Sequence, residues 1–222
     1  NTMDYHKAVD KEYQQEENVL GKHDLDFKQM VVIILTLLPI SILFSLILVW
    51  RTDFALLPMG VVCFLIGIFY TFGPMPLSRL PLGEVFSGVT MGFGIFFLAV
   101  HIQSPSDFLV TAWSLGQGVI NIDWYFAETV KIFLMSIPLI CLSATIMLAN
   151  NLCDYEQDLR NHRFTLVHYL QPKASLFLYT VLSILPWCMW LVYVILGLLP
   201  LWTFLGLILA LPFVKNLRRF QK

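Results

Sequence analysis

The sequence predicts an all-α fold, a polytopic transmembrane helical bundle. Hydrophobic residues make up 58% of the 222 residues and charged residues only 13%, whereas soluble domains contain about 45–50% apolar and about 25% charged residues. The mean hydropathy is +0.73. The apolar residues are concentrated in long runs, which is typical of membrane-spanning helices of about 20 residues.

Six apolar runs are candidate spans. In chain order they cover residues 29–50, 54–72, 83–102, 128–149, 174–196 and 199–214. The brief turn at 51–53 makes the first two spans a tight hairpin, and the short last run is expected to end near the membrane surface. Prolines inside these runs are compatible with spans, because neighbouring helices and water satisfy the freed carbonyls.

The basic residues are distributed unevenly between the two sides that six alternating spans define. All of the 14 Lys and Arg residues except Arg51 and Lys131 fall on one side. That side holds residues 1–28, 73–82, 150–173 and 215–222. The positive-inside rule makes it cytoplasmic. On the opposite side, the aromatic residues of 103–127 predict a helix that lies at the membrane interface.

The most informative polar segment, residues 150–158, follows the fourth span. Asn150, Asp154 and Asp158 are spaced four apart, so on a helix they would share one face over about 12 Å. Like charges at this spacing repel, which a purely structural helix would avoid and a divalent cation would relieve. Mg²⁺ takes oxygen ligands and binds through one or two carboxylates plus substrate phosphates. The alternative is a solvated helix end that carries a few acids.

A second acidic segment, residues 1–10, precedes the first span on the same side and contains Asp4 and Asp10. Two such segments at one membrane surface could flank a bound anion through bridging metals. Basic residues accompany them: Lys7 in the first segment, Arg79 in the loop between spans two and three, and Arg163 after the second segment. Arg presents a fork to phosphate oxygens and Lys a point charge. The alternative for each is that it only follows the positive-inside rule.

These residues resemble the UbiA prenyltransferase superfamily. Asn150, Asp154 and Asp158, with Arg-Phe-Thr-Leu at 163–166, resemble its second Asp-rich motif and the trailing Lys/Arg-x-Thr-Leu. Residues 3–10, Met-Asp-Tyr-His-Lys-Ala-Val-Asp, are similar to the later part of its first motif, Asn-Asp-x-x-Asp and then Asp.

A third stretch resembles the branch of the family that prenylates 1,4-dihydroxy-2-naphthoate. Tyr-Thr-Phe-Gly-Pro-Met-Pro at 70–76 and Leu-Gly-Glu-Val-Phe at 82–86 look like the Tyr-Thr-x-Gly-Pro and Leu-Gly-Glu segments of that branch. The family has nine spans, and Asp4 aligns with the second Asp of its first motif. The chain is therefore expected to be an incomplete enzyme sequence, either a fragment or the product of a degenerate gene, and the truncated chain itself is expected to be inactive.

The resemblance implies Mg²⁺-dependent transfer of a polyprenyl group from its diphosphate to an aromatic acceptor. The expected acceptor is 1,4-dihydroxy-2-naphthoate, which would give demethylmenaquinone, the route to menaquinone. The implied metal ligands are Asn150, Asp154, Asp158, Asp4 and Asp10, and the implied diphosphate ligands are Lys7, Arg79 and Arg163. Tyr70 is a candidate for stabilising the allyl cation. Glu84 is a candidate for orienting the acceptor or acting as a base, and is equally suited to the start of a helix.

Two regions are expected, a cytoplasmic segment at 1–28 with part of the first motif and a transmembrane bundle at 29–222 with the second motif. The site would face the cytoplasm from a bacterial plasma membrane. The expected partners are the polyprenyl diphosphate, the acceptor and membrane lipid, with no nucleic acid.

Other functions remain open. The acceptor could be 4-hydroxybenzoate-like or homogentisate-like, or the protein could be a transporter or a non-catalytic membrane subunit. The predicted spans carry almost no ionisable residues away from their ends, which argues against a conduction path. A non-catalytic subunit would not need two matched acidic segments.

Overall fold

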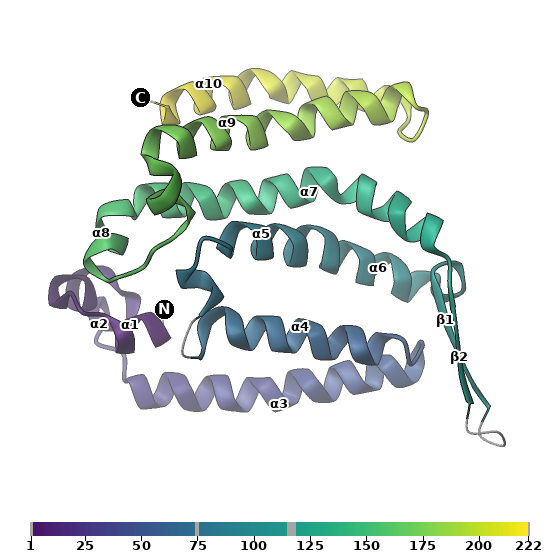
Figure 1. Cartoon of the computed structure of the whole chain (residues 1–222), viewed down its shortest axis with the longest axis horizontal. Helices are drawn as coiled ribbons and strands as arrows, with labels where there is room; N and C mark the ends of the chain where they lie inside the picture. The colour runs from purple at the N-terminus through teal and green to yellow at the C-terminus, as the bar shows by residue number, and fades with distance from the viewer. Residues whose placement is uncertain (1, 74–75, 115–118, 222) are drawn as a thin grey trace.

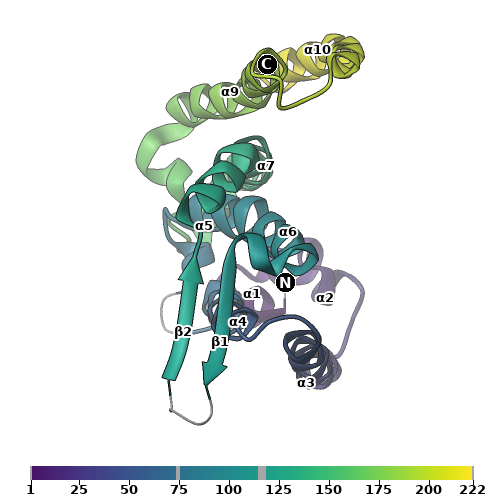
Figure 2. The same ribbon diagram turned by 90° about the vertical axis from the view of Figure 1, so that its right-hand side faces the viewer.

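The computed structural model describes residues 2–73, 76–114 and 119–221 (Figure 1). Long helices lie side by side in a stack, with α3 and α10 at its opposite ends in both views (Figures 1 and 2). Within the described residues, five helices are long and apolar enough to cross a membrane. The prediction of an all-α, polytopic membrane bundle is confirmed.

Each predicted span corresponds to a helical segment. These are α3 (Phe27–Arg51), α4 (Leu56–Thr71), Gly83–Gln103, α7 (Phe126–Cys153), α9 (Leu166–Ile195) and Leu201–Phe220. With 16 residues, α4 is the shortest; at a rise of 1.5 Å per residue it is about 24 Å long, against about 30 Å for the bilayer core.

Two of these segments are not uniform α-helices. The third consists of α5 (Gly83–Ser87), a π-helical stretch (Gly88–Gly94) and α6 (Ile95–Gln103). The last consists of a 3₁₀ stretch (Leu201–Leu209) and α10 (Ala210–Phe220), which continues past the predicted end at residue 214. In addition, α9 begins before the predicted residue 174 and kinks at Gln171, because Pro172 cannot continue a regular helix.

The short elements gather at the two ends of the stack. At one end lie α1 (Thr2–Lys7), α2 (Val19–Lys22), α8 (Tyr155–Arg160) and the loop after α4 (Figure 1). A π-helical turn (Tyr13–Glu17) joins α1 to α2, and a 3₁₀ turn (Leu77–Arg79) precedes α5. All of these belong to segments that the charge distribution assigned to one side of the membrane.

A β-hairpin occupies the opposite end of the stack. After a 3₁₀ turn (Pro105–Asp107), β1 (Leu109–Ser114) pairs antiparallel with β2 (Val119–Trp124), with Leu109 opposite Trp124. The prediction of an interfacial helix at 103–127 is therefore wrong. The stretch is rich in Val, Ile and Thr, whose branched side chains favour strands, and this preference outweighs the aromatic pattern.

A hydrogen bond from a tyrosine of α9 reaches α7 at the position of a proline. Pro138 lies inside α7 and has no N–H to donate to the carbonyl of Leu134, four residues earlier. The hydroxyl of Tyr193, a buried residue of α9, donates a hydrogen bond to that carbonyl. The neighbouring helix thus satisfies the group that the proline leaves free, as is expected where water is scarce.

The close approach of α7 to the π-helical stretch depends on glycine. A Cβ atom at Gly92 would lie 2.4 Å from the backbone N and Cα of Ile140, so no larger residue fits without moving the helices. Small residues allow membrane helices to pack closely when lipid supplies no hydrophobic driving force between them.

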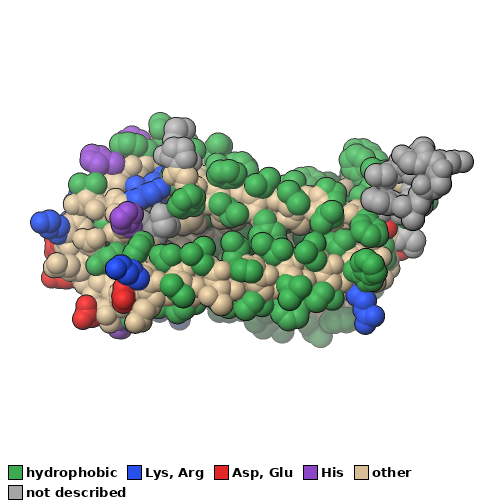
Figure 3. Space-filling model, turned by 90° about the horizontal axis from the view of Figure 1, so that it is seen from below, with side chains coloured by type: hydrophobic (Ala, Val, Ile, Leu, Met, Phe, Trp, Pro, Cys, Tyr) green, Lys and Arg blue, Asp and Glu red, His purple; other side chains and the backbone are tan. Residues whose placement is uncertain are grey.

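The outer faces of the long helices are apolar. Seen from the α3 side, hydrophobic side chains cover the stack, and most charged and histidine side chains gather at the end that holds α1, α2 and α8 (Figure 3). In α3, none of the most apolar window is buried within the protein. Such a surface is expected of a helix that faces lipid.

Candidate functional site

At the polar end of the stack, the first acidic segment contacts residues that directly follow the second acidic segment. The side-chain oxygen of Asn161 accepts hydrogen bonds from the backbone N–H groups of Val9 at 3.1 Å and Asp10 at 3.2 Å. The Asp10 carboxylate pairs with Arg160, Oδ2 to Nε at 3.3 Å. The structure therefore brings together segments that are 152 residues apart in the sequence, as the resemblance implied.

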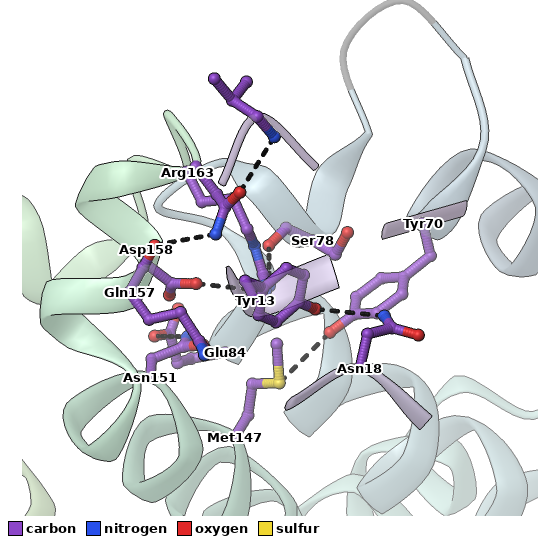
Figure 4. A network of polar contacts seen from close by, with 12 residues as sticks. Tyr13, Asn18, Tyr70, Ser78, Glu84, Met147, Asn151, Gln157, Asp158 and Arg163 are labelled. Carbon is purple, nitrogen blue, oxygen red and sulfur yellow. Dashed lines mark hydrogen bonds and ion pairs between the residues drawn. The ribbon is translucent and has the colours of Figure 1, made fainter. Parts of the chain in front are cut away.

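A more deeply buried ion pair joins Asp158 to Arg163. Asp158 Oδ1 lies 3.2 Å from Arg163 Nη1, and the two side chains are 4% and 18% exposed. The other terminal nitrogen of Arg163 donates to the carbonyl of Ser78 at 3.4 Å, across the loop that precedes α5 (Figure 4). Arg163 thus connects the second acidic segment to the third span.

Asn150, Asp154 and Asp158 do not form the single helical stripe that their spacing predicts. The chain turns at Asp154 (φ −93°, ψ 9°), between the end of α7 and the start of α8. Hydrogen bonds from Asp154 N to Asn150 O at 2.9 Å and from Asp158 N to Asp154 O at 2.7 Å bridge the turn. Because of the turn, Asn150 and Asp154 are exposed and Asp158 is buried.

The protein surroundings also affect the protonation of Asp154, although this residue is exposed. Desolvation raises the pKa of its carboxyl above the ordinary value, and the nearby charge of Arg163 partly opposes this rise. A cation that binds to Asp154 would favour the ionised form of its carboxyl group.

The predicted diphosphate ligands Lys7 and Arg79 lie at the same end. Lys7 Nζ donates to the carbonyl of Gly73 at 3.0 Å, at the end of α4. Arg79 lines a small depression shared with residues of both acidic segments. Its other lining residues are Ala8, Tyr13, Gln157, Asp158, Asn161 and Arg163. Lys7, Arg79 and Arg163 are thus all placed around the two acidic segments.

Tyr70 and Glu84 lie beside the second acidic segment. Glu84 is buried, and its Oε1 accepts a hydrogen bond of 2.7 Å from the side chain of Asn151. The Tyr70 hydroxyl donates to the sulfur of Met147 at 3.4 Å (Figure 4). Glu84 also stands in the first turn of α5, as the helix-start alternative expects, but its carboxylate bonds across to α7.

The donor groups at this end decide whether a metal ion can bind. Within the part of the chain that the structure describes, no group of three or more His, Cys, Asp and Glu side chains is placed to hold a metal. Asp4 lies in α1, and its side chain falls outside the described residues. The remaining donors are oxygen atoms of carboxylate and amide groups, the type that Mg²⁺ prefers.

An apolar groove begins beside the acidic segment. It has a volume of about 760 Å³, lies between α7, α9 and α10, and includes Asn150 in its lining. The rest of its wall is largely apolar and aromatic, with Trp187, Trp190 and Phe213 among its residues. One predicted metal ligand therefore faces a space suited to a hydrocarbon chain.

Two asparagines that the sequence reasoning did not select are central to this arrangement. Asn161 holds the first acidic segment, and Asn151 holds Glu84. Both lie within three residues of a predicted ligand, but a single amide in a polar segment has no pattern that distinguishes it. Their partners are distant in sequence, so only the fold identifies them.

The protein consists of long apolar helices with a cluster of acidic and basic side chains at one end of the stack. These features define a polytopic membrane protein with a charged site at the membrane surface. The UbiA prenyltransferase family matches residues 4–222, and the chain belongs to this family.

Among curated proteins, the chain is similar to 1,4-dihydroxy-2-naphthoate octaprenyltransferase of Bacillus subtilis (strain 168), with 29% identity over 154 residues. This match covers 69% of the chain and 43% of the relative, so it spans less than half of the relative's length. No solved structure matches the chain at a significant level.

Proposed function

We propose that this protein transfers a polyprenyl group from its diphosphate to an aromatic acceptor, with Mg²⁺ holding the diphosphate at the cytoplasmic end of the bundle. The observation that supports this most directly is the meeting of the two acidic segments through Asn161 and Arg160. A purely structural bundle would have no reason to collect carboxylates and basic side chains at one end of an apolar helix stack.

The donors fit Mg²⁺ by their chemistry. Asp10, Asp154 and Asp158 offer carboxylates and Asn150 offers an amide oxygen, and Asp4 lies in the same segment as Asp10. Mg²⁺ is commonly held by one or two carboxylates, water and the phosphates of the substrate, so a site completed by the diphosphate requires no cluster of three carboxylates. Bound there, the metal would neutralise the negative charge that develops on the leaving diphosphate.

The basic side chains would bind the diphosphate directly. The Nε atom of Arg163 is buried and has no hydrogen-bond partner among the described residues, so it can donate to a phosphate oxygen. Lys7 and Arg79 line the same end of the stack. Charge-assisted hydrogen bonds to phosphate are about twice as strong as neutral ones, which favours ionisation of the allylic C–O bond.

The prenyl chain would lie in the apolar groove, where Asn150 stands near the acidic segment and the aromatic side chains line the rest. Tyr70, half-buried beside Glu84, offers an aromatic face near the site of ionisation, where a cation–π contact would stabilise the allyl cation. The acceptor is proposed to be 1,4-dihydroxy-2-naphthoate, on the name of the Bacillus subtilis relative.

Transfer of label from a radioactive polyprenyl diphosphate tests this proposal. Membranes that express the gene for this chain are incubated with Mg²⁺ and, in separate reactions, with 1,4-dihydroxy-2-naphthoate, 4-hydroxybenzoate and homogentisate. Label is expected in a prenylated product of the naphthoate. A product with one of the other acceptors would correct the acceptor, and no transfer to any of them, compared with membranes lacking the gene, would refute the enzyme assignment.

A further inference from the structure

The hydrogen bond between Asn151 and Glu84 joins the second acidic segment to the third span. Glu84 is 3% exposed and Asn151 4%. The amide Nδ2 of Asn151 donates to Glu84 Oε1 at 2.7 Å (Figure 4), a short distance typical of a donor facing a charged acceptor. The bond fixes one of the two carboxylate oxygens.

The second oxygen of Glu84 has no such partner. Oε2 is buried, and no hydrogen bond reaches it from any residue that the structure describes. A buried polar atom without a partner is costly, and in native proteins it calls for an explanation. A hydrogen-bond donor on a bound ligand would supply the missing partner.

The surroundings of Glu84 favour an aromatic ligand. The Tyr70 hydroxyl and the Met147 side chain lie next to Gly83, where an added Cβ would be 3.9 Å from the tyrosine oxygen and 3.5 Å from the methionine methyl. The tyrosine donates to the Met147 sulfur at 3.4 Å, and sulfur is a weak acceptor. A ring that carries a hydroxyl could contact these side chains and donate to Glu84.

We propose that Asn151 is a positioning residue for the aromatic acceptor. Its amide holds Oε1 of Glu84, so that Oε2 accepts a hydrogen bond from a hydroxyl of the acceptor ring. This inference rests on the proposed function. Asn151 directly follows Asn150, the proposed metal ligand at the diphosphate. These two neighbouring residues would therefore position the acceptor and the diphosphate relative to each other.

The substitution Asn151→Asp tests this role, because a carboxylate cannot donate to Glu84. Transfer is measured in membranes with saturating labelled polyprenyl diphosphate and varied 1,4-dihydroxy-2-naphthoate. The KM for the naphthoate is expected to rise about tenfold or more, the effect of losing about one hydrogen bond to a charged group. The KM for the diphosphate is expected to stay within about twofold. Asn121→Asp, the same change at an exposed position of β2, is the matched control.

A double variant separates positioning from a merely structural role. In Glu84→Gln with Asn151→Asp, the amide at position 84 can donate to the carboxylate at position 151, so the bond between α5 and α7 is restored in the opposite direction. Stability in detergent is expected to recover, and the KM for the naphthoate is expected to fall back toward the wild-type value, because the amide oxygen at position 84 is then left to accept the hydroxyl of the acceptor. An unchanged KM in the single variant, or a KM that stays raised in a double variant of recovered stability, would overturn the inference. Wild-type membranes that transfer no label to any acceptor would overturn the proposed function and this inference with it.

Discussion

The buried ion pair between Arg163 and Asp158 is expected to make a large contribution to the stability of the site, and a single substitution tests it. Arg163→Gln would leave the Asp158 carboxylate, whose side chain is 4% exposed, without its cationic partner. Breaking a buried ion pair from one side costs about 3–5 kcal/mol, because a buried charge stays uncompensated. The free energy of unfolding should fall by that amount.

The structure offers a matched control three residues earlier. Arg160 makes an ion pair with Asp10 at a similar distance, 3.3 Å, but its side chain is 53% exposed. Exposed pairs contribute about 0–1 kcal/mol, so Arg160→Gln should be nearly neutral. The same chemical change is thus predicted to differ in cost by a few kcal/mol, because the Arg163 side chain is more buried than that of Arg160 and also donates to the carbonyl of Ser78.

Equilibrium unfolding of the purified protein in mixed detergent micelles measures both variants. Adding Asp158→Asn to Arg163→Gln should recover most of the lost stability, since neither charge then remains buried. Equal losses for Arg163→Gln and Arg160→Gln, or no recovery in the double variant, would refute the reasoning.

Three further predictions concern stability and use the same unfolding assay. Tyr193→Phe should cost about 1–3 kcal/mol by leaving the Leu134 carbonyl unpaired, and markedly less in a Pro138→Ala background, where residue 138 regains its N–H; an equal cost in both backgrounds would contradict this. Gly92→Ala should cost about 1–3 kcal/mol by overpacking against α7, whereas Gly94→Ala, whose added Cβ comes no closer than 3.7 Å to a neighbour, should be tolerated; equal effects would be evidence against it. Desolvation raises the pKa of Asp154 in the folded protein, so the metal-free protein should gain stability as the pH falls through that pKa. The variant Asp154→Asn should show a weaker dependence of stability on pH. A pH profile of the variant that runs parallel to that of the wild type would argue against this prediction.

Composition and the length of the apolar runs were sufficient to predict the helices. Each of the six predicted spans corresponds to an observed helical segment, because the need for about 20 apolar residues leaves a strong signal. The hairpin at 109–124 was missed, since its aromatic residues suit an interfacial helix as well as a strand. Helix ends were predicted less accurately: α10 continues past residue 214, and the continuation of α9 upstream of Pro172 was not predicted.

The sequence predicted which types of side chain form the candidate site and on which side of the membrane they lie, but not how they contact one another. Spacing placed Asn150, Asp154 and Asp158 on one stripe, but the turn at Asp154 buries Asp158 and leaves the other two exposed. The partners of Asp10 and Glu84 come from residues that no motif marks, Asn161 and Asn151. Such contacts depend on how segments distant in sequence pack together, which local patterns do not encode.

The central claim is that the carboxylates of the second acidic segment support Mg²⁺-dependent prenyl transfer. Its most direct test is the rate of label transfer from polyprenyl diphosphate in wild-type, Asp154→Asn and Asp158→Asn membranes, each with Mg²⁺ and with EDTA. Transfer by the wild type should require Mg²⁺, and each variant should fall by about 100-fold or more, since these charges act on the ionising bond. Near-normal turnover in both variants, or wild-type transfer that persists in EDTA, would contradict the claim.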